Sequence, residues 1–217
     1  MRFDAVIFDM DGVLVDSEVY WAEGRIEFAR DRGLVWGADD HRLVMGRATL
    51  EWAQVMKDYL HIADPPRAIA DEMITRMNAK YDARLPVREG AIDAVKLAAS
   101  RYRVGLASGS PTPLIDHVIQ LTGLDKVFET VVYGDDIPHG KPAPDIYWEA
   151  LKRLGVEPSR AVGVEDSGNG IRSLHAAGMK IIAAPSPQFP LKDDILALAH
   201  AKIDTLEDFT LALVESL

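Results

Sequence analysis

Five short apolar runs, separated by segments with helical periodicity, constrain the fold of this chain more than any other feature. The runs are residues 4–9, 103–107, 130–133, 161–164 and 180–184. Continuous apolar runs are typical of strands that are covered on both faces, as in parallel sheets. Strands that alternate with helices predict an α/β fold with a doubly wound, Rossmann-like parallel sheet.

Two of the intervening segments carry clear helix signals. Residues 145–154 repeat apolar side chains near a period of 3.6, and Gly155 is a suitable stop. Pro111 follows Ser110 and is well suited to begin a helix over 111–122, because proline is favoured in the first helical turn.

Residues 17–86 interrupt the alternation, because they contain helical patterns and no convincing strand. We therefore expect a helical cap domain at 17–86, inserted into an α/β core of residues 1–16 and 87–217, with Pro86 at the return. Its position after the first strand suits a lid, although an insertion that only adds stability is the alternative. Three apolar stripes mark its helices: Val19, Ala22, Ile26 and Ala29; Leu50, Ala53, Met56 and Leu60; and Ile69, Met73, Met77 and Tyr81, which follow Pro65 and Pro66.

Composition excludes several classes of protein. The chain has 217 residues, which is enough for a large core with a small second lobe, and no cysteine, which excludes disulfides and thiolate chemistry. A formal net charge of −10 argues against nucleic acids and anionic membranes as partners. Neither a run of about 18 apolar residues nor a signal peptide is evident, so we expect a cytoplasmic protein. We further expect it to be a monomer or a weak homodimer.

The stretch VIFDMDGVLVDSE, residues 6–18, places two acids at the end of the first strand. Ligands of open α/β sheets bind at the carboxyl ends of strands, and residues two apart in extended chain point the same way. Asp9 and Asp11 could therefore face one cleft, while Gly12 permits a sharp turn or a close backbone approach. Taken alone, this pair is a weak signal, since such acids often only solvate a strand end.

Two further clusters suit the binding of an anion. Ser108, Gly109 and Ser110 lie between a strand and a helix, where hydroxyl and N–H groups can bind a phosphate. For Ser110, simple N-capping is an equal alternative. Lys141 lies between Gly140 and Pro142, and lysine is a compact phosphate partner, although a solvated loop lysine is the common alternative.

The fourth cluster, VGVEDSGNG at 162–170, repeats the design of the first. Glu165 and Asp166 follow an apolar strand and precede a glycine-rich loop. Acids from two strand ends that meet in one cleft repel each other unless a cation lies between them. Oxygen ligands with few carboxylates suit Mg²⁺, which takes a further ligand from a phosphate. We therefore expect Mg²⁺ beside Lys141.

Together, and in this order, the four clusters resemble those of the haloacid dehalogenase superfamily. The matching residues are D-x-D-G-V at 9–13, Ser108, the lysine of G-K-P at 141, and E-D-S-x-x-G at 165–170. The place of the helical insertion resembles the subgroup with an α-helical cap after the first strand.

The resemblance implies a role for each motif residue. Asp9 would be the nucleophile that forms an aspartyl-phosphate, and Asp11 the general acid and base. Mg²⁺ would be held by Asp9, the backbone carbonyl of Asp11 and Asp166, with Glu165 in support through water. The phosphoryl oxygens would be held by Ser108, Gly109 and Lys141.

The resemblance also narrows the reaction. Dehalogenases and phosphonate-cleaving relatives lack an acid two residues after the nucleophile, so Asp11 favours phosphoryl transfer, and P-type pumps would need a membrane domain. The stretch DSEVYW at 16–21 is more similar to hexose- and hexitol-phosphate phosphatases. We therefore expect a magnesium-dependent phosphatase of small sugar or polyol phosphates.

Other functions stay open. A phosphomutase of the β-phosphoglucomutase type would carry a histidine where this chain has Trp21. In this chain Arg47 follows Gly46 directly, which does not fit the spacing of the basic residues in the first cap loop of such mutases. A phosphoglycolate phosphatase and a non-catalytic phospho-ligand binder are the remaining alternatives. In the cap, Trp21, Arg47 and Trp52 are candidates for substrate contact. The alternative for both tryptophans is a place in the core of the cap, and for Trp52 this alternative is favoured. The alternative for Arg47 is a position on the surface.

Overall fold

The computed structural model describes residues 3–44, 47–187 and 189–217. Its sheet is parallel, with the strand order β3-β2-β1-β4-β5-β6, which confirms the predicted doubly wound α/β fold. The predicted strands lie within one residue of the observed bounds, whereas β6 was not predicted because two residues show no periodicity. The strands are β1 (Ala5–Phe8), β2 (Arg103–Ser108), β3 (Thr130–Tyr133), β4 (Ala161–Glu165), β5 (Lys180–Ala183) and β6 (Ala201–Lys202).

The strand order places β1 between β2 and β4, at the point where the direction of winding changes. Residue pairs such as Phe8 with Leu106 and Phe8 with Val164 fix the register on both sides. A switch point of this kind leaves a crevice beyond the carboxyl ends of the neighbouring strands. The residues that follow β1, β2 and β4 therefore share one edge of the sheet.

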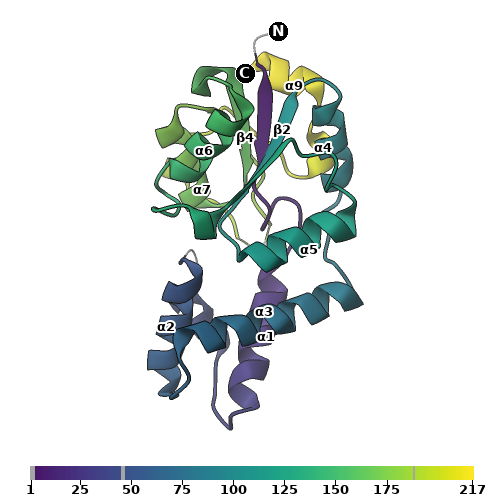
Figure 1. Ribbon diagram of the computed structural model, residues 1–217. Coiled ribbons are helices and arrows are strands. Elements are labelled where there is room, and N and C mark those ends of the chain that lie inside the picture. Colours follow the sequence, from purple (N-terminus) through teal and green to yellow (C-terminus); the bar gives the residue numbers. More distant parts are fainter. Residues whose placement is uncertain (1–2, 45–46, 188) are drawn as a thin grey trace.

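Helices cover both faces of the sheet, with α6 and α7 on one side and α4, α5 and α9 on the other (Figure 1). The side chains of β1 alternate between two buried clusters: Val6 and Phe8 enter one, Ala5 and Ile7 the other. This two-sided burial explains why the strand is apolar throughout. The core helices are α4 (Ala91–Ala99), α5 (Thr112–Thr122), α6 (Asp145–Leu154), α7 (Gly168–Ala177), α8 (Asp193–Leu196) and α9 (Leu211–Ser216).

The predicted helix ends are largely confirmed. Helix α6 has the predicted bounds, and Gly155 ends it with a φ of 62°, in the left-handed region that glycine adopts readily. Helix α5 begins one residue later than predicted, at Thr112, with Pro111 as its N-cap residue.

Helices α1 (Glu18–Arg30), α2 (Thr49–Leu60) and α3 (Pro66–Ala83) pack on one another beyond the end of β1 (Figure 1). A 3₁₀ helix, Ala38–Leu43, lies between α1 and α2. The two segments that join this helical group to the sheet run antiparallel. The amide of Asp16 donates to the carbonyl of Pro86 at 2.8 Å, and that of Arg88 to Leu14 at 2.9 Å.

The apolar stripes of these helices were predicted with mixed success. The α3 stripe is buried in full, whereas Leu50 of the α2 stripe is half exposed. The α1 stripe was wrong, because Val19 and Ile26 are 42% and 41% exposed. Helix α1 instead turns Gly24 toward α3, where a Cβ would lie 3.2 Å from Met73 Cε. A glycine allows close helix packing, so the buried face is the one that carries Trp21, Gly24, Arg25 and Phe28.

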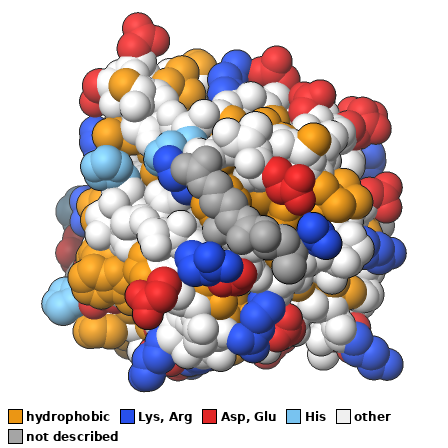
Figure 2. All heavy atoms as spheres, turned by 90° about the horizontal axis from the view of Figure 1, so that it is seen from above, with side chains coloured by type: hydrophobic (Ala, Val, Ile, Leu, Met, Phe, Trp, Pro, Cys, Tyr) orange, Lys and Arg blue, Asp and Glu red, His pale blue; other side chains and the backbone are white. Residues whose placement is uncertain are grey.

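None of the described helices is long and apolar enough to cross a membrane. At the end of the molecule opposite α1–α3, acidic and basic side chains are interspersed (Figure 2). Among the described residues drawn on that face, neither sign of charge covers a continuous area.

Candidate active site

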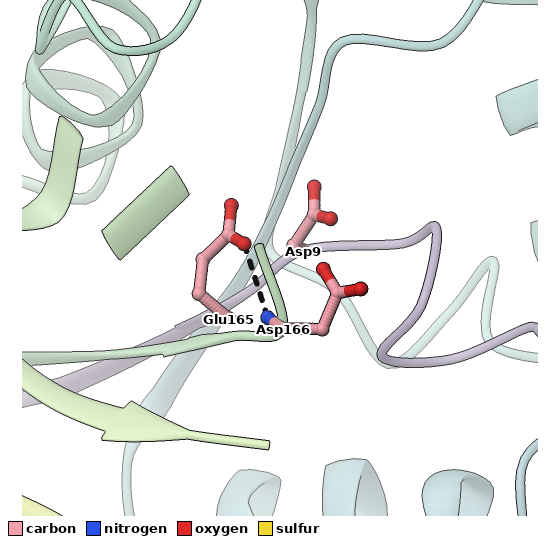
Figure 3. A group of neighbouring side chains, drawn as sticks. All are labelled: Asp9, Glu165 and Asp166. Atoms are coloured by element: carbon pink, nitrogen blue, oxygen red, sulfur yellow. Dashed lines mark hydrogen bonds between the residues drawn. The ribbon is translucent and has the colours of Figure 1, made fainter. Parts of the chain in front are cut away.

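The acids at the ends of β1 and β4 lie together. The amide of Asp9 donates to the carbonyl of Val164 at 3.0 Å, which extends the pairing of the two strands by one residue. Asp9, Glu165 and Asp166 each place a carboxylate oxygen within 4.8 Å of the others (Figure 3). Asp9 is 5% exposed and Glu165 is fully buried. The structure thus brings together acids that are more than 150 residues apart in the chain.

Gly12 makes this arrangement possible. Its φ is +74°, and a Cβ at this position would lie 1.9 Å from Asp166 Oδ2. The loop that follows Asp11 therefore passes directly over the carboxylate of Asp166. The prediction that Gly12 provides a sharp turn and a close backbone approach is confirmed.

Lys141 provides the positive charge of the cluster. Its Nζ donates to Asp9 Oδ1 at 2.7 Å, to Glu165 Oε1 at 2.6 Å and to the carbonyl of Ala107 at 3.2 Å. These three acceptors match the three N–H donors of an ammonium group. The ammonium also lies 5.0 Å from the centre of the Tyr147 ring. Lys141 is therefore not a solvated loop lysine.

Both carboxylate oxygens of Glu165 are engaged by protein donors. Oε1 accepts from Lys141 and from the Tyr147 hydroxyl at 2.8 Å. Oε2 accepts from the amides of Asp166 and Ser167, at 3.1 and 3.2 Å, and from the Ser167 hydroxyl at 3.1 Å. At Gly170, a Cβ would lie 1.8 Å from Glu165 Cδ, so the first turn of α7 closes over this side chain. Glu165 thus orients Lys141 and the loop that carries Asp166.

Asp11 is held apart from this cluster by three serines. Its Oδ1 accepts from the Ser17 hydroxyl at 2.6 Å, and its Oδ2 from the hydroxyls of Ser108 and Ser110, at 3.3 and 2.6 Å. Ser17 directly precedes α1, whereas Ser108 ends β2. The second acid is therefore bound at the junction between the core and the helical group.

The interpretation of Ser110 as an N-cap residue is wrong. Helix α5 begins too late for that role, and Asp135 Oδ2 accepts from the amide of Thr112 at 3.1 Å instead. Ser110 turns its hydroxyl to Asp11, and its amide donates to Ser108 Oγ at 3.1 Å. Next to them, a Cβ on Gly109 would meet no atom within 4 Å, so the 108–110 loop borders open space there.

The electrostatics of the cluster favour an added cation. Burial raises the pKa of Asp9 to about 8; Lys141 opposes this effect, and Glu165 and Asp11 add to it. Burial, together with Glu165 and Asp9, also raises the pKa of Asp166 well above its usual value. Lys141 stays charged because Asp9 and Glu165 overcome the effect of burial and raise its pKa. One ammonium faces three acids, and the oxygens of Asp9 and Asp166 are suitable ligands for a hard divalent cation.

The structure separates the cap candidates. Trp21 and Trp52 are 6% and 5% exposed, and their rings meet edge to face with centroids 5.5 Å apart. Both therefore contribute to the buried interior of the helical group. Arg47 is exposed, and its Nε donates to the carbonyl of Leu43 at 2.8 Å. The structure does not bring Arg47 into contact with the described residues of the acidic cluster.

Asp135 is a residue that sequence reasoning missed. Its Oδ1 accepts from the Thr49 hydroxyl at the start of α2, at 3.1 Å, while its Oδ2 binds the amide of Thr112. It therefore connects the helical group to the core. The signal was available, since Asp135 follows β3 much as Asp9 follows β1.

Tyr147 and Arg88 were also missed. Tyr147 lies six residues after Lys141, at a buried position of α6 that gave no sign that its hydroxyl would bind Glu165. Arg88 donates from Nη1 to the carbonyls of Gly12 and Ala184 and so ties the first motif loop to the end of β5. Nothing in the sequence around Arg88 indicates this contact.

Known proteins resemble this chain over most of its length. A phosphorylated carbohydrates phosphatase of Thermotoga maritima is 33% identical over 82% of this chain and 83% of its own. Hexitol phosphatase B of Escherichia coli K12 is 30% identical over 95% and 94%. The crystal structure of CbbY from Rhodobacter sphaeroides, in complex with phosphate, superposes with a TM-score of 0.86 at 25% identity, over 98% of this chain and 99% of CbbY.

A model of one family matches residues 3–178, a range that contains each of the four motifs. The chain thus belongs to the haloacid dehalogenase-like hydrolases.

Proposed function

We propose that this protein is a magnesium-dependent phosphatase that hydrolyses small sugar or polyol phosphates through an aspartyl-phosphate. The observation that carries the proposal is the ion pair between Asp9 and Lys141, at 2.7 Å, which lies beside Asp166. A second acid, Asp11, follows Asp9 by two residues in the chain. The relatives named as phosphatases of phosphorylated carbohydrates and of hexitol phosphates support the choice of substrate class.

In the first step, a carboxylate oxygen of Asp9 bonds to the phosphorus of the ester. The bond between phosphorus and the ester oxygen breaks, and Asp11 donates a proton to that oxygen, so that a neutral alcohol leaves. A carboxylate is a competent nucleophile for such a transfer, and protonation of the leaving group lowers the barrier.

In the second step, Asp11 takes a proton from a water molecule. The water oxygen bonds to the phosphorus, the bond from phosphorus to Asp9 breaks, and inorganic phosphate is released. The serine hydroxyls that hold Asp11 keep its carboxylate at one side of the cleft during both steps. Both acids thus return to their starting state.

Lys141 would balance charge on the transferring group, and the hydroxyl of Ser108 would donate a hydrogen bond to one of its oxygens. Mg²⁺ would be held by Asp9, Asp166 and the backbone carbonyl of Asp11, and would supply further positive charge at the phosphoryl oxygens. Glu165 would keep Lys141 in place, because its own oxygens are occupied by protein donors. Such preorganised charge is commonly the largest contribution to the catalysis of phosphoryl transfer.

We also propose that residues 17–86 act as a cap over the cleft. The contact between Thr49 and Asp135 and the hydrogen bond from Ser17 to Asp11 support a closed arrangement. A closed cap would exclude bulk water and contact the part of the substrate that leaves as alcohol.

The test is phosphate release from a panel of phosphorylated sugars and polyols, with Mg²⁺ or with EDTA. We expect turnover with Mg²⁺, loss of turnover with EDTA, and none from Asp9→Asn. Asp93→Asn is the matched control, because Asp93 is exposed on α4, and it should keep full activity. Binding of phosphate esters without turnover by the wild-type protein would instead indicate a phospho-ligand binder.

A further inference from the structure

Arg25 is a buried residue with two side-chain nitrogens that have no hydrogen-bond partner in the described part of the chain. The residue lies on α1 and is 5% exposed. Its Nε and Nη1 are buried and have no hydrogen-bond partner among the residues that the structure describes. Buried donors without a partner are rare and destabilise a protein by about 1–3 kcal/mol each. These N–H groups therefore call for an acceptor that arrives from outside the chain.

The position of Arg25 relates it to the proposed reaction centre. Helix α1 begins directly after Ser17, which donates to Asp11. Glu18, in the first turn, interacts electrostatically with both Asp11 and Arg25. Residues seven apart share a helix face, about 10 Å apart along the axis, and side chains lean toward the N-terminus. Glu18 and Arg25 thus lie on one face of α1, with Glu18 nearer to Asp11 and Arg25 farther from the phosphate position.

The surroundings of Arg25 define what it can bind. Its guanidinium lies 5.1 Å from the centre of the Trp21 ring, an apolar face that can hold the guanidinium plane by cation–π attraction. Glu18 adds acceptors to the donors of Arg25, and such a pair suits hydroxyl groups, which both donate and accept. A second anionic group would be repelled by Glu18, which already lies in the field of Asp11 and Asp16.

We propose that Arg25 selects the leaving group: its free N–H groups bind hydroxyls at the far end of a neutral polyol chain whose phosphate lies at Asp9. This inference rests on the proposed function and assigns to Arg25 the role that Arg47 was expected to fill. A bisphosphate would bring its second charge against Glu18.

The experiment compares Arg25→Met with Arg30→Met on three substrates. Methionine keeps the length and the packing of the side chain but has no donor, and Arg30 lies on the same helix with a side chain that is 70% exposed. The substrates are sorbitol 6-phosphate, hexyl phosphate, which has the same length without hydroxyls, and p-nitrophenyl phosphate.

For Arg25→Met we expect kcat/KM to fall about 10- to 100-fold on sorbitol 6-phosphate, which is the loss of one charged hydrogen bond or slightly more. On hexyl phosphate and p-nitrophenyl phosphate, kcat/KM of Arg25→Met should change less than about threefold. For Arg30→Met, kcat/KM on each of the three substrates should also change less than about threefold. An equal loss on the polyol and alkyl esters would overturn the inference, since a structural defect affects both alike.

Two measurements keep the test decisive if Arg25→Met does not fold. Arg25→Lys retains the charge without the planar fork, and it should lose part of the preference for sorbitol 6-phosphate over hexyl phosphate. The wild-type protein should show that preference itself, and should disfavour sorbitol 1,6-bisphosphate. An absence of preference, or preference for the bisphosphate, overturns the inference while the phosphatase proposal stands. Absence of all turnover would overturn the phosphatase proposal itself.

Discussion

At the scale of single residues, the two aspartates of the first motif occupy different environments although only one residue separates them. Asp9 is bound to an ammonium and borders Asp166, whereas the donors to Asp11 within the described ranges are serine hydroxyls. Environments that differ in this way allow one acid to act as a nucleophile and the other to move protons. The division of roles can be tested by separate loss of turnover and of metal binding.

We expect Asp11→Asn to lower kcat by about 10²-fold or more, because general acid–base help is worth that much. Its backbone carbonyl is unchanged, so the affinity for Mg²⁺ should fall less than in Asp166→Asn, which loses a carboxylate. Titration calorimetry with Mg²⁺, beside phosphate-release kinetics, provides both numbers. Equal loss of Mg²⁺ affinity in the two variants would show that the assignment of roles is wrong.

Gly12 offers a sharper test, because Gly33 is a matched control. Both glycines have positive φ, at 74° and 68°, but a Cβ at Gly33 would meet no atom within 4 Å. Gly33→Ala should therefore only lower the free energy of unfolding by about 1–2 kcal/mol, the cost of a left-handed alanine. Gly12→Ala should in addition displace Asp166 and weaken Mg²⁺ binding.

Urea unfolding and Mg²⁺ titration of the two alanine variants supply the comparison. If Gly12→Ala bound Mg²⁺ as well as Gly33→Ala does, the contact of Gly12 with Asp166 would have no bearing on metal binding.

At the scale of elements, Asp135 joins two helix ends that belong to different parts of the molecule. One oxygen binds the side chain of Thr49 on α2, and the other binds the amide of Thr112, at the start of α5. The first contact concerns closure of the proposed cap, and the second the stability of α5. Two variants separate these effects.

Thr49→Val removes only the contact to α2, and Asp135→Ala removes both. We expect Thr49→Val to change the free energy of unfolding by less than about 0.5 kcal/mol, because the bond is exposed, yet to raise KM for a polyol phosphate. Asp135→Ala should also destabilise the protein by about 0.5–2 kcal/mol, the usual loss for a helix N-cap. Chemical unfolding and steady-state kinetics measure both effects, and identical stability losses would contradict this account.

The elements also show how far the sequence can predict this structure. Strands β1 to β5 and helix α6 were predicted closely, because burial on both faces and a helical period leave a clear local pattern. The buried face of α1 was not, since its packing depends on the approach of Gly24 to Met73, a contact between distant residues. Strand β6 escaped prediction because its two residues are too few to show a period.

In the candidate site too, residues with a local sequence signal were predicted and residues whose role depends on distant contacts were not. Asp9, Lys141, Glu165 and Asp166 were expected to meet because each follows or faces a strand end, and the strand order brings those ends to one edge. The hydroxyl of Tyr147 and the guanidinium of Arg25 gave no local signal, because their importance depends on what lies around them once the chain has folded.

At the scale of the whole molecule, the acidic cluster makes stability depend on pH. Asp9 has a pKa of about 8 in the folded state, against 3.8 as a free side chain. The folded protein therefore binds a proton that the unfolded chain releases between these two values. The contribution of Asp9 to stability is complete below about pH 4 and is lost as the pH rises toward 8 and above.

Asp9→Asn should remove the contribution of Asp9 to this dependence, because an amide has no proton to lose, whereas the contribution of Asp166, whose pKa is also raised, stays. Without metal at pH 8.5, we expect the variant to be more stable than the wild-type protein by about 1 kcal/mol or more, since one pKa unit is worth about 1.4 kcal/mol. The difference should shrink toward pH 5. Urea unfolding at the two pH values measures it, with Asp93→Asn as the control that follows the wild-type protein at both.

Mg²⁺ should reverse the wild-type trend, because a cation between Asp9 and Asp166 stabilises their ionised forms and competes with protons. A ligand that binds only the folded state stabilises it by RT ln(1 + [L]/Kd), which amounts to about 2.7 kcal/mol at a hundredfold excess over Kd. A concentration of 5 mM Mg²⁺ is roughly such an excess if Kd is about 50 μM. We therefore expect 5 mM Mg²⁺ to raise Tm more at pH 8.5 than at pH 5.5. The Asp9→Asn protein should show little change at either pH. Equal increases of Tm at both pH values, or an undiminished increase in Asp9→Asn, would place Mg²⁺ elsewhere on the protein.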